Sequence, residues 1–536
     1  MELHPADHVV LILYLGAMMF LGWRLSKGQT TDEEYFLGGR RLPWFAVGVS
    51  IIASLLSSIS FLAYPGVIWR FGFGQLISTF LSFPIDLLVI LLVTIPFFAR
   101  FRFTSAYEYL EHRFDLSVRL LGASMFLVFV SVLMGVIVLV SSRALSVASG
   151  IPLMAVIATV GIVATVYTMM GGIRAVVWTD VIQVAILLGG GIFTIIYVAA
   201  VTGSGPWDWI DVVSTRDNER FTFFSLDPTL PATVVTFTLS DSLWVIVAHC
   251  ANQMTMQRYF STVDIQARKR SFVTGTLVGL CVILILSTVG ASLVYYFTQG
   301  PESLPQTIDV ASGKDRDSIF PFFVATRIPA GLAGAIFAAL LAAAMSTIDS
   351  GVNAFATVAT VDFGRLRKKK KEGNNIFQAR VITLAVGGAV TLGAMYLDTL
   401  TGADDILTIL PKTFNSLVGP MGGVFFAGML IPRASSRAVW IAAIVGFLTA
   451  LGVAYSRELL QLLGPSTPAT LGAVLDEEFS QRLFDQGLGF TWIVICSSLA
   501  SIGTAWLMSF VFPNRDEDRI RGLTWQTRHQ RGSVTS

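Results

Sequence analysis

Long apolar runs separated by short polar connections dominate the sequence. A membrane-spanning helix needs about 18–20 consecutive apolar residues, and runs of that length are typical of membrane spans. Thirteen such runs are present, with edges uncertain by a few residues. They lie at 8–25, 44–68, 73–98, 116–148, 153–171, 177–201, 233–257, 271–298, 320–360, 376–397, 405–431, 438–455 and 489–512.

The pattern predicts an all-α polytopic membrane protein with thirteen transmembrane helices. In lipid, each span must pair its own backbone N–H and C=O groups, and a helix does so. Composition agrees, because only 13% of the residues are charged, about half the share found in soluble proteins. The first run is no convincing signal peptide, since the acidic stretch MELHPAD precedes it and Arg24 and Lys27 follow it.

Basic residues predict the orientation. With thirteen spans, seven basic connections fall on the same side of the membrane, and they hold most of the 37 Lys and Arg residues. The positive-inside rule makes that side cytoplasmic. We therefore expect a plasma or inner membrane protein with its N-terminus outside and its C-terminus inside. The connections are 24–41, 100–119, 174, 258–270, 365–380, 433–437 and 515–531.

One transmembrane domain, 1–512, and a short cytoplasmic tail, 513–536, account for the chain. There is no Walker-type nucleotide loop and no HExxH motif, so we expect no enzyme. The three cysteines are scattered over separate spans and form no metal or disulfide pattern. A net charge of +2 implies no nucleic-acid partner. Movement of a solute across the bilayer is the remaining function class, as a carrier or as a channel.

A polar stripe interrupts the ninth run, in AAAMSTIDSGVN at 342–353. Four side chains with helical spacing share one face, and Thr347 flanks it; they are Ser346, Asp349, Ser350 and Asn353. Small residues leave backbone carbonyls approachable. The carbonyl of Ala343 and the hydroxyls of Ser346 and Thr347 would suit a small hard cation such as Na⁺, which prefers oxygen ligands.

Close packing between helices is the alternative explanation of the stripe, because Ala, Ser and Thr let spans approach one another. Asp349 favours a functional cavity, since a carboxylate at bilayer depth costs several kcal/mol without a partner or water. A second carboxylate, Asp180, lies about one turn into the sixth run with Gln183 on the same face. Stabilisation of a helix N-terminus is the alternative role for Asp180.

The second and seventh runs are predicted to be broken helices. Five serines within eleven residues, followed by Pro65 and Gly66, weaken the second run as a lipid-facing helix. Asp241, His249 and Asn252 interrupt the seventh. Discontinuous helices near the midplane build substrate and ion sites in many secondary transporters. Packing between helices is again the alternative for the serines.

Several stretches resemble the sodium:solute symporter family in motif, order and spacing, from about residue 30 to 440. The stretch ASLLSSISFLAYPGVIWRFGFG is most like the branch that carries monocarboxylates, vitamins and iodide. The motifs are TSAYEYLEHRF (104–114), GGIRAVVWTDVIQ (171–183), NQMTMQRYFST (252–262), AAAMSTIDSGVN and GPMGGVFFAGMLIPRASS (419–436).

The resemblance implies a LeuT-type fold, with two inverted five-helix repeats at about 44–201 and 233–431. One N-terminal and two C-terminal spans complete the thirteen. It also implies a sodium site, formed by the carbonyls and hydroxyls of Ala53, Leu56, Ala343, Ser346 and Thr347. A second sodium site is implied at Asp180 and Ser350, where Asp349 replaces a hydroxyl and leaves the number of ions open.

The solute site is carried over at five positions: Ser57, Ser60, Thr79, Ser82 and Asn252. Asp86 and Asp241 depart from the family pattern and would bind a cationic group or pair with each other. Arg143 and Lys412 are the intramembrane cations considered for a carboxylate, and neither is clearly placed to receive one. The sequence thus predicts a monomeric symporter that imports a small polar solute with Na⁺, by alternating access. Branch similarity suggests a carboxylate or vitamin-like anion, and a sodium-dependent sensor or cation channel is the alternative.

Overall fold

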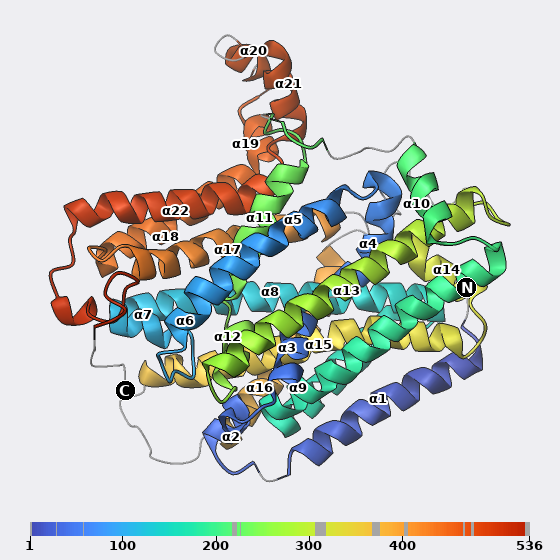
Figure 1. Cartoon of the computed structure of the whole chain (residues 1–536), viewed down its shortest axis with the longest axis horizontal. Helices are drawn as coiled ribbons and strands as arrows, with labels where there is room; N and C mark the ends of the chain where they lie inside the picture. The colour runs from blue at the N-terminus through green and yellow to red at the C-terminus, as the bar shows by residue number, and fades with distance from the viewer. Residues whose placement is uncertain are drawn as a thin grey trace. The chain divides into compact units, whose positions relative to one another are not determined.

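The computed structural model describes most of the chain (Figure 1). The described residues are 3–27, 29–56, 58–216, 222–225, 227–305, 318–366, 376–400, 406–464, 467–472 and 476–530. They are helical almost throughout, and an isolated bridge between Ala434 and Pro513 is the only β-pairing among them.

The α-helices follow one another with short connections. Their bounds are α1 Pro5–Leu25, α2 Asp32–Leu37, α3 Trp44–Leu55, α4 Ser58–Phe71, α5 Gly74–Val89, α6 Ile95–Phe98, α7 Glu108–Arg113, α8 Leu116–Ser149, α9 Leu153–Thr202, α10 Pro206–Thr215, α11 Val234–Ala248, α12 Gln253–Phe260, α13 Ile265–Thr298, α14 Ile319–Arg327, α15 Leu332–Val361, α16 Ile376–Leu400, α17 Ile406–Leu430, α18 Ser436–Ala454, α19 Ser456–Leu462, α20 Thr467–Gly472, α21 Glu477–Gln486 and α22 Thr491–Val511.

Within the described residues, nine helices are long and apolar enough to cross a membrane, or up to eleven if each of two bent pairs is one span. The expected thirteen spans stay a prediction. One reason for the lower count is α9, which contains both of the runs expected at 153–171 and 177–201. Its backbone leaves the helical region at Gly172, with φ 53° and ψ −156°, a conformation that favours glycine.

Both predicted helix breaks are confirmed. Helices α3 and α4 are bent by 65°, and α11 and α12 by 51°. Leu56 follows α3 in an extended conformation, with φ −87° and ψ 116°. The last carbonyls of a helix have no partner inside it. The break in the second expected span therefore offers carbonyl oxygens inside an otherwise apolar segment.

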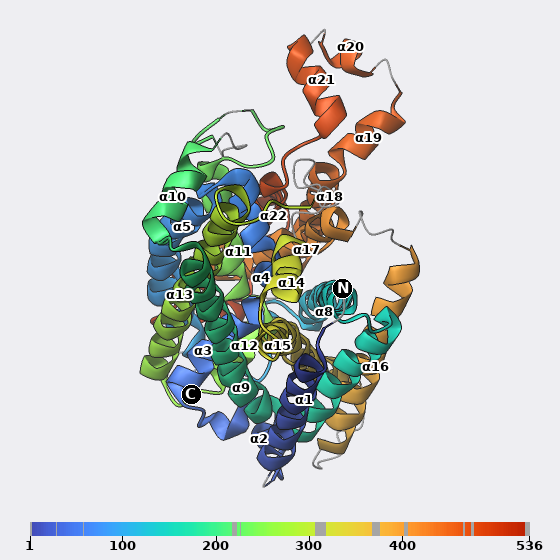
Figure 2. The ribbon, with the colours of Figure 1, turned by 90° about the vertical axis from the view of Figure 1, so that its right-hand side faces the viewer.

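Chain contacts divide the protein into two compact units. The first unit comprises Met1–Leu76, Leu133–Arg220 and Gln257–Asp404, and the second comprises Ile77–Val132, Phe221–Met256 and Asp405–Ser536. In the first unit, α15 packs against α1, α3, α4, α9 and α16, and Figure 2 shows it among them. In the second unit, α17, α18 and α22 pack side by side, and α11 packs against α17 and α22.

Helix α15 is the most buried candidate span, which explains how it can carry polar side chains. Its N-terminus is capped from α1: the Asp7 carboxylate accepts the amide N–H groups of Gly331 and Gly334, each at 2.7 Å. Small residues bring other helices close. A Cβ on Gly48 of α3 would lie 2.4 Å from the carbonyl oxygen of Ser271 on α13. Both features belong to the first unit and hold its helices around α15.

Candidate sodium and solute sites

The predicted sodium ligands come from the end of α3 and the middle of α15. The Ser346 hydroxyl donates to the carbonyl of Ala53 over 2.5 Å, so two of the five predicted ligands are in direct contact. The Thr347 hydroxyl lies 3.4 Å from the carbonyl of Ala343, one turn earlier in its own helix. All four residues are buried, and Leu56 is partly buried at the helix break. The arrangement offers neutral oxygens, the ligand type that a small monovalent cation prefers.

Asp180 lies in a network that sequence reasoning missed, because it is paired with an arginine. Arg258 of α12 donates from Nη2 to Asp180 Oδ2 at 3.1 Å and to Ser350 Oγ at 2.5 Å. It also donates from Nε to Ser50 Oγ at 2.6 Å, and Ser50 donates onward to Asp180 Oδ2 at 2.5 Å. The arginine is 1% exposed and the carboxylate 0%. Three helices and α12 therefore meet at one buried ion pair.

Arg258 corrects the charge analysis of the sequence. It was counted with the basic connection 258–270, yet α12 continues to Phe260 and the guanidinium is buried. Arg258 is part of the motif NQMTMQRYFST. Its position a few residues before the loop was the sign in the sequence that it belongs to the helix. The alternative role for Asp180, at a helix terminus, is wrong, because Asp180 lies about two turns beyond the break in α9 at Gly172.

Asp349 adjoins the same network. Its Oδ2 accepts the Tyr167 hydroxyl at 2.6 Å and lies 3.4 Å from the Thr179 hydroxyl. Ser350 Oγ lies 3.3 Å from Asp349 Oδ1 and 2.9 Å from Ser54 Oγ. The predicted second sodium ligands Asp180, Asp349 and Ser350 are thus brought together. With both carboxylates ionised, one guanidinium leaves the group with a formal charge of −1.

Two atoms in this region have no hydrogen-bond partner among the described residues: Asp180 Oδ1 and Gln183 Oε1. The amide Nε2 of Gln183 lies 3.3 Å from the Tyr14 hydroxyl of α1. Buried polar atoms without partners are rare and costly. An acceptor of this kind beside a net negative group suits a further cation.

The predicted solute residues are distributed over both units. Ser57 lies outside the described residues, and Ser60 is a partly buried residue of α4 in the first unit. Thr79, Ser82 and Asn252 belong to the second unit. The Ser82 hydroxyl lies 2.8 Å from Asp241 Oδ2 and 2.9 Å from the Thr79 carbonyl. Asn252 accepts the amide of Met254 at 2.9 Å in the break before α12. Their role in solute binding stays a prediction.

The two intramembrane cations considered for a carboxylate both have acidic partners. Arg143 donates to Asp398 at 2.6 and 3.0 Å, and Lys412 donates to Glu458 at 2.7 Å. A solute carboxylate would have to displace these partners. Asp86 and Asp241, which the sequence left unplaced, belong to α5 and α11, and the contact between Ser82 and Asp241 joins these two helices.

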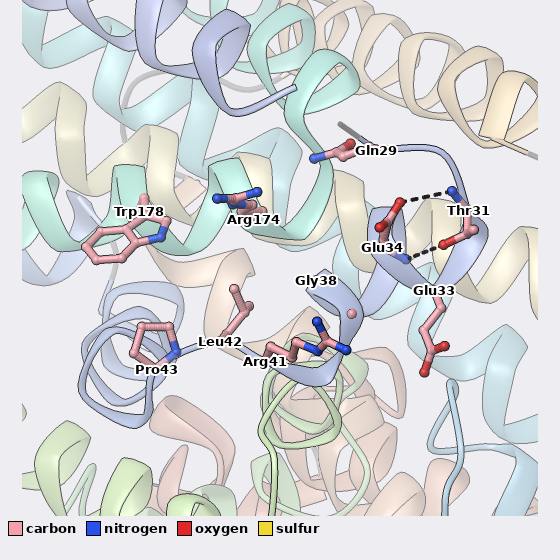
Figure 3. Close-up of a pocket in the computed structure, with 11 residues that line it drawn as sticks. Gln29, Thr31, Glu33, Glu34, Gly38, Arg41, Leu42, Pro43, Arg174 and Trp178 are labelled. Carbon is pink, nitrogen blue, oxygen red and sulfur yellow. Dashed lines mark hydrogen bonds between the residues drawn. The ribbon is translucent and has the colours of Figure 1, made fainter. Parts of the chain in front are cut away.

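A cavity of about 560 Å³ opens beside the start of α3 in the first unit. Its lining contains none of the predicted sodium or solute ligands. Arg174 and Trp178 reach it from α9, and Arg41 reaches it from the chain before α3 (Figure 3). Glu34 on its wall is held by Thr31, whose hydroxyl accepts the Glu34 amide at 3.2 Å. Hydrogen bonds from the backbone N–H groups and the side chains of Thr30 and Thr31 lower the pKa of the Glu34 carboxyl.

Comparison with known proteins gives one consistent family. A model of the sodium:solute symporter family matches residues 35–446. The sodium/sialic acid symporter SiaT of Proteus mirabilis is 32% identical over 472 residues, which cover 86% of this chain and 92% of that one. Human sodium-coupled monocarboxylate transporter 1 is 30% identical over 454 residues, covering 84% and 72%.

A solved structure gives the same result. The substrate-bound, outward-open state of a Na⁺-coupled sialic acid symporter superposes with a TM-score of 0.80 at 27% identity, covering 96% of this chain and 100% of that one. The expected all-α LeuT-type fold is confirmed, whereas the division into inverted repeats stays a prediction.

Proposed function

The chain belongs to the sodium:solute symporter family, and we propose that it imports a small carboxylate-bearing solute together with Na⁺ by alternating access. Coupling of a small organic solute to sodium follows from the family and its relatives. The carboxylate on the solute is the more specific part of the proposal, and relatives named for sialic acids and monocarboxylates support it. Vitamin-like anions belong to the same proposal, since a multivitamin transporter is also similar.

The contact between Ser346 and Ala53 carries the proposed sodium site. It joins the break after α3 to the buried helix α15, so an ion there would bind across two elements. Sodium bound by both would hold α3 and α15 in one arrangement and release them when it leaves. Such an ion biases a conformational equilibrium by its differential affinity for the two states. The effect of sodium on solute affinity must equal the effect of solute on sodium affinity.

A second sodium at Asp180, Asp349 and Ser350 is the more demanding part of the proposal. Arg258 already supplies one positive charge to these residues. With both carboxylates ionised, the group keeps a formal charge of −1, and this charge and the unpartnered Asp180 Oδ1 support one additional monovalent cation. We propose that this cation is sodium, so that sodium activation of uptake is cooperative. A Hill coefficient near one would count against it.

The multi-pass membrane location is part of the family identity. We propose in addition that the N-terminus is outside, that the C-terminus is cytoplasmic and that the monomer is the transport unit. That orientation is supported by the distribution of Lys and Arg, because most of these residues lie in the connections that it places on the cytoplasmic side. Reactivity of single cysteines, placed at either end of a cysteine-free variant, toward a membrane-impermeant reagent would test it.

Purified protein in liposomes gives the direct test of sodium-coupled uptake. Radiolabelled carboxylates should accumulate with an inward sodium gradient and not with an equal potassium gradient. Saturation by the solute and dependence on it distinguish a carrier from a channel, which would pass current without any solute. Sodium current in liposomes that lack solute, with no sodium-driven uptake of any carboxylate, would contradict the proposal.

A further inference from the structure

Two acidic side chains of the second unit lie within candidate spans, on two helices that side-chain hydrogen bonds join. Asp86 belongs to α5, inside the candidate span Gly74–Phe98, and Asp241 belongs to α11. Asp86 lies one helical turn after Ser82 on α5, and Ser82 contacts Asp241. Hydroxyl contacts tie the helices together: Thr238 Oγ1 lies 3.2 Å from the Ser78 carbonyl, and Ser82 Oγ lies 2.8 Å from Asp241 Oδ2.

The Asp86 carboxylate is incompletely partnered. Its side chain is 6% exposed, and Oδ1 has no hydrogen-bond partner among the described residues. Neither Asp86 nor Asp241 has an ion pair in that part of the chain. A carboxylate in a membrane span is costly and marks a site with a partner or water. Asp241 is partly exposed, whereas Asp86 is buried.

Sharing of a proton is the simplest alternative, because two adjacent carboxyls avoid repulsion in this way. A shared proton would place a hydrogen bond between the two carboxyls, and Asp86 Oδ1 would then be a candidate partner. The structure leaves that atom without one. A cationic nitrogen would balance the charge of the two carboxylates and would also donate hydrogen bonds to Asp86 Oδ1.

We propose that Asp86 and Asp241 bind a positively charged nitrogen of the transported solute. The inference rests on the proposed function and adds a cationic group to the carboxylate, as in amino acids and betaines. It also explains Ser82, which was expected to contact solute and here donates to Asp241. Sodium is the less suitable occupant, because the predicted sodium ligands all lie in the first unit.

Matched solute pairs test the inference on the full-length protein. Thermal stability of the purified protein is measured in sodium and in potassium with glycine betaine against dimethylbutyrate, alanine against propionate, and sialic acid as a further carboxylate without a cationic nitrogen. We expect sodium-dependent stabilisation by a nitrogen-bearing member and a weaker effect of its nitrogen-free partner. A panel in which no nitrogen-bearing solute gives a sodium-dependent shift overturns the inference.

Two variants locate the effect. Asp86→Asn and Asp241→Asn should each weaken binding of the nitrogen-bearing solute about ten- to hundredfold, the range for a lost charged hydrogen bond. Asp485→Asn, an exposed residue of α21, is the control and should leave binding unchanged. Unaltered affinity in both variants also overturns the inference. Neither result touches the proposed function, which fails only if no carboxylate is taken up with sodium.

Discussion

Two pairs of carboxylates in the spans differ in what neutralises them. In the first unit, Asp180 is paired with the buried guanidinium of Arg258, and Asp349 adjoins that ion pair through Ser350. Asp86 and Asp241 in the second unit have no such partner among the described residues. All four residues are aspartates within the expected spans, so the difference lies in the surroundings. A membrane-embedded Asp can therefore belong to the fixed framework or be left to meet a group that arrives.

The first pair, Asp180 and Asp349, belongs to the fixed framework and is also the proposed site of an incoming cation. Arg258 donates to Asp180, Ser50 and Ser350, which come from α9, α3 and α15. An ion pair with this many hydrogen bonds holds helices in register, because the loss of either charge leaves the other buried. The remaining formal charge of −1 is where an additional cation would bind. The second pair, Asp86 and Asp241, has no ion pair among the described residues, so neutralisation of its charge depends on a group that binds.

Breaking the fixed ion pair should have the largest effect. Asp180→Asn or Arg258→Gln should each destabilise the protein by about 3–5 kcal/mol, because the partner is left as an uncompensated buried charge. Sodium-driven uptake should fall steeply in both. The double variant should recover much of the stability and none of the transport. Denaturation midpoints in potassium buffer, with uptake measured in liposomes, check both parts.

Asp398→Asn is the matched control for this cycle. It breaks the partly exposed pair with Arg143 in the same unit, and such pairs contribute about 0–1 kcal/mol. If the double variant were as unstable as the sum of the single variants, Asp180 and Arg258 would not be coupled. Near-normal uptake by Asp180→Asn at limiting sodium would remove Asp180 from the ion site.

The proposed sodium site should show an intermediate effect. Ser346→Ala removes a hydroxyl ligand while keeping the backbone of α15. Apparent sodium affinity should fall about two- to tenfold, the range of one neutral polar interaction. Ser292→Ala in α13 is the control, since its buried hydroxyl donates to the Val289 carbonyl of its own helix at 2.8 Å. Unchanged sodium dependence together with lower stability would mean that Ser346 serves helix packing.

The second carboxylate pair should respond to the same substitution in the opposite way. Asp86→Asn removes a charge that repels Asp241 and has no cation to lose. Without solute, stability should stay within about 1 kcal/mol of the parent protein or rise, unlike the loss expected for Asp180→Asn. Melting temperatures of both variants, measured side by side in solute-free buffer, make the comparison. A loss as large as that of Asp180→Asn would place Asp86 in a fixed network.

Local patterns in the sequence predicted much of this arrangement. Periodicity placed Ser346, Asp349 and Ser350 on one face, and serines with Pro65 and Gly66 marked the break after α3. The pairing of Asp180 with Arg258 joins positions 78 residues apart. No local pattern reports such a contact, and the charge of Arg258 read as part of a loop. Asp86 and Asp241 are likewise far apart in the chain, and the sequence left open whether they bind a cationic group or pair with each other.

Asp7 gives the smallest expected effect and a reference for the comparison, because it has the role that was the alternative for Asp180. It is 2% exposed and caps the N-terminus of α15 through the amides of Gly331 and Gly334. Asn can still accept one of these hydrogen bonds but loses the charge that favours a helix N-terminus. Asp7→Asn should therefore cost about 0.3–1 kcal/mol.

Sodium affinity should not change in Asp7→Asn, since Ser346 lies about four turns further along α15. Chemical denaturation and sodium-activated uptake of Asp7→Asn, measured beside Ser346→Ala, separate a cap from a ligand. A loss of sodium affinity as large as that of Ser346→Ala would show that the cap from α1 sets the position of the α15 ligands. In that case the capping carboxylate, too, would belong to the framework of the ion site.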